Sequence, residues 1–168
     1  SHVPTLLRCP RLIEQRNRLL QVRAPADRMA PWDEQLATAG MEFIDRRRRA
    51  VAALQNEIGR VYPGIAGRHS KVHVTYRSGI GEATEPAALV AALERSRNEE
   101  LRRGQTGVGP HRDDLGLEID GMDARTFGSR GQQRTAALSL KLAEVALMRE
   151  STGEMPLLLL YDVMSELG

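Results

Sequence analysis

The sequence predicts a mixed α/β protein, and within this chain an α+β arrangement in which helices precede most of the strands. Apolar residues recur every three or four positions in several long segments, which is the pattern of one buried face of a helix. In contrast, residues 72–77 alternate between apolar and polar side chains, as in a half-buried strand. A continuous apolar run at 157–160 indicates a strand that is covered on both faces.

Two amphipathic helices are predicted at the start of the chain. The first spans 11–22 and ends in the proline-containing segment 24–32, which we expect to be a loop. The second begins at Trp32 and ends at Pro63-Gly64. Its buried stripe is expected to consist of Leu36, Gly40, Ile44, Arg47, Val51, Leu54, Ile58 and Val61.

A strand and a third helix complete the helical part. The strand is predicted at 70–78, with its apolar residues toward the core and His73 toward solvent. The helix is predicted at 85–103 because Pro86 suits a first turn and a glycine follows the last residue. We therefore assign 1–104 to a mainly helical domain with one strand.

Residues 105–168 are predicted to form a second domain, made of a hairpin, a helix and a buried strand. The dipeptide Asp120-Gly121 is favoured in a two-residue hairpin turn. The strand before it is expected to carry Leu115, Leu117 and Ile119 on one face. The helix is expected to bury the stripe Ala137, Leu138, Val145, Leu147 and Met148.

The composition indicates a soluble globular protein whose core is mainly aliphatic. Hydrophobic residues make up 41% of the 168 residues and aromatic residues only 4%. The sequence has no apolar run of about 18 residues for a membrane span, and its start lacks the pattern of a secretory signal, so we expect a cytoplasmic protein. The single cysteine, Cys9, excludes an internal disulfide, and we expect no catalytic role for it.

The segment "FGSRGQQRTAALSLKLAE" (127–144) places small residues directly before a helix. The first N–H groups of a helix lack partners inside it and the helix dipole is positive there, so this start suits an anion. An ordinary N-cap by Ser129 explains the same residues. Asp162, at the carboxyl end of the predicted buried strand, lies where α/β sheets bind ligands and adds weight to the anion interpretation.

Two charged clusters have competing interpretations. Arg46, Arg47, Arg48 and Arg49 are candidates for DNA phosphate contacts, but the run covers a full helical turn, and a solvated, salt-bridged face explains at least two of them. The segment 111–114 contains a histidine and two aspartates, of which only two residues share a strand face. Two ligands are too few for a metal site, so none is predicted.

Three segments carry a family resemblance: "VGPHRDDL" (108–115), "SRGQQRTAALSLKLAE" (129–144) and "LLLLYDVMSEL" (157–167). They resemble the carboxyl-terminal part of the RecF family, bacterial recombination-repair ATPases of the ABC type that are related to the heads of SMC proteins and Rad50. Upstream, "RNRLL" (16–20) and "WDEQLATAG" (32–40) resemble the helical second domain of that family. The resemblance implies a partial ABC-type P-loop ATPase head with an α-helical lid or arm domain.

The resemblance also implies a composite nucleotide site. In this family two heads enclose ATP, and the signature motif of one head caps the nucleotide that the other head holds. Ser129, Gly131 and Gln132 match that signature and would meet the γ-phosphate, while Arg134, one turn later, would couple nucleotide state to the head. For Arg134, a surface arginine paired with an acid is the alternative.

Several positions depart from the family pattern. Asp162 matches the acid that activates the attacking water, whereas Tyr161 stands at the position of the magnesium-binding acid. A phenol with a pKa near 10 is a poor Mg²⁺ ligand. Gly168 replaces an expected aspartate, and the sequence contains no G-x-x-x-x-G-K-[ST] phosphate loop. We therefore expect this chain to be inactive as an ATPase on its own.

The resemblance implies a function for the parent protein. It would use ATP and Mg²⁺, with no cofactor bound tightly to this chain alone, form an ATP-dependent homodimer, and bind double-stranded DNA and single-strand/double-strand junctions. With RecO and RecR it would support RecA loading at gaps. Two alternatives stay open: a non-catalytic protein-interaction module, and the head of another SMC- or Rad50-like ATPase. Pro25, Pro31 and Pro63 argue against the latter because they would break a coiled coil.

Overall fold

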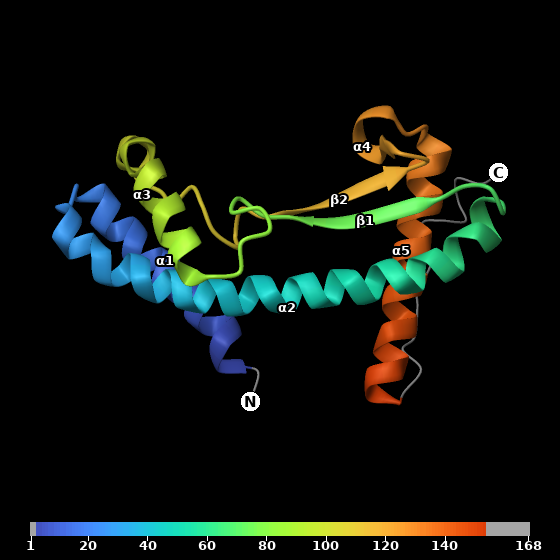
Figure 1. Cartoon of the computed structure of the whole chain (residues 1–168), viewed down its shortest axis with the longest axis horizontal. Coiled ribbons are helices and arrows are strands. Elements are labelled where there is room, and N and C mark those ends of the chain that lie inside the picture. The colour runs from blue at the N-terminus through green and yellow to red at the C-terminus, as the bar shows by residue number, and fades with distance from the viewer. Residues whose placement is uncertain (1–2, 154–168) are drawn as a thin grey trace. The chain divides into compact units, whose positions relative to one another are not determined.

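The computed structural model describes residues 3–153 (Figure 1). These residues form four long helices, two strands of six residues, one short strand and one short helix. In chain order they are α1 (Val3–Gln21), α2 (Ala26–Ala66), β1 (Val72–Arg77), α3 (Pro86–Arg103), β2 (Asp114–Ile119), β3 (Met122–Asp123), α4 (Ala124–Phe127) and α5 (Arg130–Thr152). None of the helices in this described range is long and apolar enough to cross a membrane.

The chain forms two compact units, each assembled from segments that are separate in sequence. Of the described residues, the first unit contains 3–48 together with Arg77–Asp114, and the second contains Arg49–Tyr76 and 115–153. Helix α2 contributes its first part to one unit and its remainder to the other. The two compact units do not coincide with the two domains that the sequence predicted, 1–104 and 105–168. That division into domains stays a prediction.

Helices α1 and α2 are longer than predicted. The expected loop at 24–32 is wrong from Ala26 onward, because α2 begins there and continues through Pro31. At its other end α2 continues through Pro63 to Ala66. Each proline removes one hydrogen bond near an end of a 41-residue helix, which the remaining bonds tolerate. Pro31 and Pro63 therefore do not argue against the alternative that the chain is the head of another SMC- or Rad50-like ATPase.

The core of the first unit lies among α1, the first part of α2, and α3. Helix α3 matches its prediction: Pro86 occupies its first turn, and Gly104 ends it with a left-handed φ of 67° and an N–H that donates to the Glu100 carbonyl at 2.7 Å. At Gly40 of α2 an added Cβ would lie 2.8 Å from Leu89 Cδ2. Glycine thus lets α2 and α3 approach closely. The buried apolar residues of this unit include Leu12, Leu20, Met29, Leu36, Ile44, Leu89 and Leu93.

The second unit contains a three-stranded sheet in the order β1-β2-β3. Strands β2 and β3 are antiparallel with Ile119 opposite Met122, and Asp120 and Gly121 form the turn with φ values of 52° and 80°. These angles confirm the predicted two-residue hairpin. Side chains from α2, the sheet, α4 and α5 form its core: Ile58, Tyr62, Val72, Val74, Ile119, Ala124, Ala136 and Ala143.

Strand β1 is held by side chains as well as by the sheet. Val72 and Val74 are buried and His73 is exposed, as predicted. The Gln55 amide of α2 accepts from Val74 N at 2.6 Å and donates to the Val72 carbonyl at 3.4 Å. At the start of the strand, the Asp120 carboxylate accepts from Lys71 N at 2.7 Å.

The apolar stripe predicted for α5 is wrong. Ala136, Ser139 and Ala143 are the buried residues of this helix, whereas Ala137 and Met148 are exposed. The buried positions of this helix thus all carry small side chains. The larger apolar residues consequently lie toward the sides of the helix. The predicted strand face is also only partly buried, since Leu115 is 46% exposed while Ile119 is 2% exposed.

Candidate functional site

Helix α5 begins with a capping box at Ser129. The Ser129 hydroxyl accepts from Gln132 N at 3.2 Å, and the Gln132 side-chain oxygen accepts from Ser129 N at 2.9 Å. The ordinary-cap interpretation is thus part of the observed geometry. In this arrangement Gln132 orients Ser129, because its side chain is engaged with the backbone of its own helix.

The chain enters α5 through a tight turn after α4, at the end of the hairpin (Figure 1). The Gln133 side-chain nitrogen donates to the carbonyls of Ala124 at 2.8 Å and Gly128 at 3.2 Å, which holds α4 against the start of α5. An added Cβ at Gly128 would lie 2.5 Å from the Ala124 carbonyl oxygen. Backbone closeness, rather than an unusual φ, therefore requires glycine at this position.

The start of α5 presents backbone to solvent. Residues 129–134 are all exposed, and a Cβ added at Gly131 would meet no atom within 4 Å among the described residues. The amides of Arg130 and Gly131 lie in the first turn, where the helix offers them no acceptor. This geometry can accept an anion and let a second surface approach closely. Arg134 is exposed one turn later, and its coupling role stays a prediction.

The predicted catalytic segment lies outside the described residues. Tyr161, Asp162 and Gly168 all follow residue 153, as does the apolar run 157–160. The roles given to them in the nucleotide site therefore stay predictions.

The four consecutive arginines of α2, residues 46–49, differ in the groups that they contact. Arg47 stacks on the Phe43 ring at 4.3 Å and donates to the Pro110 carbonyl, while Arg48 donates to the carbonyls of Gly81 at 2.6 Å and Ala83 at 2.9 Å. Two of the four guanidinium groups thus support loops of the first unit through backbone carbonyls, which differs from the solvated, salt-bridged face given as the alternative. DNA contact by Arg46 and Arg49 stays a prediction.

A buried charge network in the first unit was missed by sequence reasoning. Arg16 of α1 is fully buried, and its guanidinium bonds Asp33 at 2.6 Å and Thr106 at 3.0 Å and lies 2.7 Å from a Glu100 carboxylate oxygen. Arg97 of α3 reaches the second Asp33 oxygen at 2.7 Å. The network carries two positive and two negative side chains, so its charges balance. The sequence feature that could have revealed this network is a charged residue within the apolar stripe of each of the helices α1, α2 and α3.

The same network organises the segment that contains His111. Thr106 N and its hydroxyl both donate to the Asn17 side-chain oxygen at 2.7 Å, and the Thr106 carbonyl lies 2.9 Å from His111 Nε2. Asp113 accepts from Gly79 N at 3.1 Å. These contacts give His111 and Asp113 roles in loop structure. Within the described part of the chain, no group of three or more potential metal ligands occurs.

The thiol of Cys9 is buried in the first unit. Burial raises the pKa of the Cys9 thiol above its ordinary value, while the nearby Arg47 charge acts in the opposite direction. A raised thiol pKa keeps the sulfur protonated and poorly nucleophilic.

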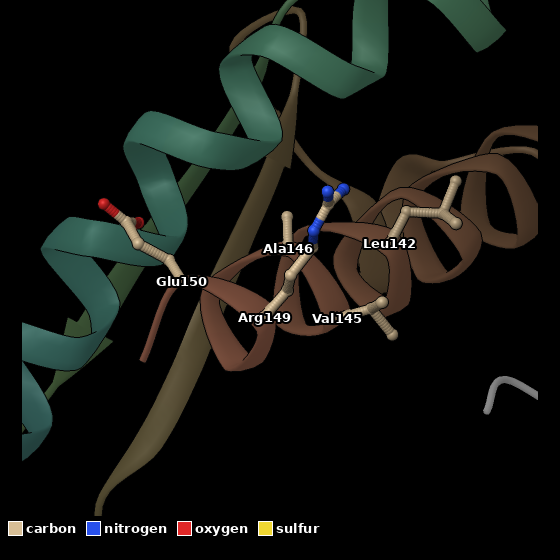
Figure 2. Close-up of a pocket in the computed structure, with 5 residues that line it drawn as sticks. All are labelled: Leu142, Val145, Ala146, Arg149 and Glu150. Atoms are coloured by element: carbon tan, nitrogen blue, oxygen red, sulfur yellow. The ribbon is translucent and has the colours of Figure 1, made fainter. Parts of the chain in front are cut away.

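Figure 2 shows a surface hollow on the second half of α5, lined by Leu142, Val145, Ala146, Arg149 and Glu150.

Comparison with known proteins finds similar sequences and structures, although no family model matches the chain. The chain is 41% identical over 181 residues to the DNA replication and repair protein RecF of Roseiflexus castenholzii, covering 99% of this chain and 46% of that protein. It is 45% identical over 175 residues to RecF of Symbiobacterium thermophilum, covering 99% and 47% respectively. The chain is thus similar, over nearly its whole length, to about half of each of these RecF proteins.

The fold agrees with solved RecF structures. The chain superposes on the recombination mediator protein RecF-ATP of the RecFOR pathway with a TM-score of 0.88 and 36% identity, covering 98% of this chain and 46% of that one. The predicted fold class is confirmed: the chain is a mixed α/β part of an ABC-type ATPase fold with a small antiparallel sheet. It spans about half the length of the RecF proteins that it matches.

Proposed function

We propose that this chain supplies the signature half of a composite ATP site in a RecF-type DNA repair protein. The observation that carries the proposal is the exposed start of α5, where Ser129 is held by a capping box and Gly131 leaves open space. The solved RecF structure with ATP supports a nucleotide as the ligand. ATP bound to one protomer would meet this helix start on the other.

The residues fit a triphosphate through backbone groups. The amides of the first turn and the positive end of the helix dipole favour a negatively charged phosphate. The Ser129 hydroxyl, already oriented by Gln132, adds a donor next to them. Glycine at 131 removes the side chain that would separate this backbone from the nucleotide.

The parent protein would act as an ATP-dependent homodimer on DNA in the cytoplasm. Arginine contacts to phosphates would give it affinity for double-stranded DNA and for single-strand/double-strand junctions with little base specificity. RecO and RecR would be its partners in supporting RecA loading at gaps. Membership of the RecFOR pathway, stated for the solved relative, supports this assignment.

Substitution of Gly131 tests the proposal in the full-length protein that contains this chain. We expect Gly131→Leu to raise the dissociation constant of the ATP-dependent dimer at least about tenfold, roughly 1.4 kcal/mol, because the side chain would hold the protomers apart. Sedimentation with and without a non-hydrolysable ATP analogue measures the dimer.

Gly59→Leu is the matched control. Gly59 is also an exposed helical glycine around which an added Cβ meets nothing within 4 Å among the described residues. Both changes should leave folding intact or raise stability slightly, since leucine is a better helix former than glycine. An ATP-dependent dimer as strong in Gly131→Leu as in Gly59→Leu would contradict the proposal.

Tyr161 supports a second candidate function, a non-catalytic interaction module. Its phenol does not fit a Mg²⁺ site at neutral pH, so we propose no hydrolytic step through it. In the full-length protein, Tyr161→Asp is expected to increase ATP turnover, measured as phosphate release, with Tyr161→Phe as a control that should not. Absence of turnover in a folded, dimeric Tyr161→Asp protein would favour the non-catalytic function.

A further inference from the structure

The solvent-facing side of α1 carries a row of arginines. Arg8, Arg11 and Arg18 are exposed, and their spacings of three and seven residues place them on one face of the helix. Gln15 continues the same face between them. The opposite face is buried and contains Arg16 of the charge network. The row is therefore distinct from the arginine that stabilises the interior.

The row retains unbalanced positive charge. Arg8 and Arg11 make no ion pair with any of the described residues. Arg18 pairs with Glu14 at 2.6 Å, but the two side chains are 63% and 61% exposed. An ion pair so exposed to water holds its partners weakly, so Arg18 can exchange Glu14 for another anion.

Two other arginine clusters of the first unit make contacts within that unit. Arg47 and Arg48 bond loop carbonyls, as described above. On α3, Arg102 and Arg103 both pair with Glu99. The hydrogen bond from Arg103 lowers the pKa of Glu99, and the charges of both arginines act in the same direction. Arg102 and Arg103 share one carboxylate, which leaves one unbalanced positive charge on α3, whereas the three arginines of the α1 row with Glu14 leave two.

We propose that the exposed face of α1, formed by Arg8, Arg11, Gln15 and Arg18, binds the phosphodiester backbone of DNA. This inference rests on the proposed DNA-binding function and assigns it a surface. From Arg8 to Arg18 the helix rises about 15 Å, which matches the rise of about four base pairs along the DNA axis at about 3.4 Å each. Guanidinium groups suit phosphate because they donate two parallel hydrogen bonds.

The test compares DNA binding by variants of the full-length protein. For Arg8→Gln/Arg11→Gln we expect about a tenfold loss of affinity at low salt, equal across DNA sequences, and a salt slope smaller in magnitude by about 2. Arg102→Gln/Arg103→Gln removes the same charge from α3 and should change affinity less than about threefold. Arg8→Lys/Arg11→Lys should keep most of the salt slope, because it keeps the charge. Circular dichroism checks that each variant is folded.

The outcomes separate this inference from the function on which it rests. If the unsubstituted protein binds DNA and the α1 and α3 double variants are indistinguishable, the α1 surface is wrong while DNA binding stands. If the unsubstituted protein binds no DNA, both are wrong. A loss confined to binding of an acidic protein partner would also overturn the assignment to DNA.

Discussion

Arg16→Met is expected to destabilise the first unit by about 3–5 kcal/mol. The substitution keeps the length of the side chain but removes the charge that lies between Asp33 and Glu100. Both carboxylates are about 1% exposed, so water cannot replace the lost partner. Thr106 also loses a donor to its hydroxyl. The size of the effect arises from charges left buried without their partner, rather than from the net strength of the ion pairs.

The tryptophan of this chain makes the effect measurable. Trp32 belongs to the first unit and precedes Asp33, so its fluorescence during urea unfolding reports on this unit. Arg18→Met is the matched control on the same helix, since its pair with Glu14 is exposed, and it should cost less than about 1 kcal/mol. Equal midpoints for the two variants would show that the network contributes no more than a surface pair.

Gly128→Ala is expected to destabilise the second unit by about 2–3 kcal/mol, the upper part of the range of about 1–3 kcal/mol for overpacked sites. The added methyl group would lie 2.5 Å from the Ala124 carbonyl oxygen, and a backbone atom cannot move aside as a flexible side chain does. The turn would open, and the Gln133 bonds to the Ala124 and Gly128 carbonyls would weaken. Thermal unfolding by circular dichroism gives the stability, and amide exchange at α4 and the start of α5 locates the change.

Gly131→Ala, three residues later, provides the comparison. Its methyl group meets no described atom within 4 Å, so we expect unchanged or slightly higher stability. The two glycines thus separate folding from function: alanine at 128 should act through stability, and larger residues at 131 through the dimer. A Gly128→Ala protein as stable as Gly131→Ala would refute the close-contact argument.

Elements with local signals could be predicted from the sequence. Helix α3 has a proline at its start and a glycine at its end, and the hairpin has the Asp120-Gly121 pair that tolerates positive φ. The alternation in β1 likewise placed Val72 and Val74 in the core. In each case the deciding chemistry lies within a few residues, which is why the pattern was sufficient.

Features that depend on distant residues could not be predicted. Arg16 and Thr106 are 90 residues apart in sequence, and their bond arises from helix packing. The buried face of α5 consists of small residues, whereas hydrophobicity alone favoured the larger ones nearby. For the site, Ser129 as a helix cap was evident from its pattern. The close approach at Gly128 was not, because it depends on where the short helix α4 places a carbonyl.

The Gln55 side chain lies against strand β1, where it bonds backbone groups that a further strand could otherwise pair with. Within residues 3–153, strand β1 lies at one end of the three-strand order, and a strand in that position exposes backbone groups that can pair with another molecule. The Gln55 side chain bonds the N–H of Val74 and the carbonyl of Val72, two groups on the same side of the strand. A side-chain amide thereby occupies the place that a strand from another molecule would take. We therefore expect this glutamine to hinder strand pairing at this edge of the described sheet.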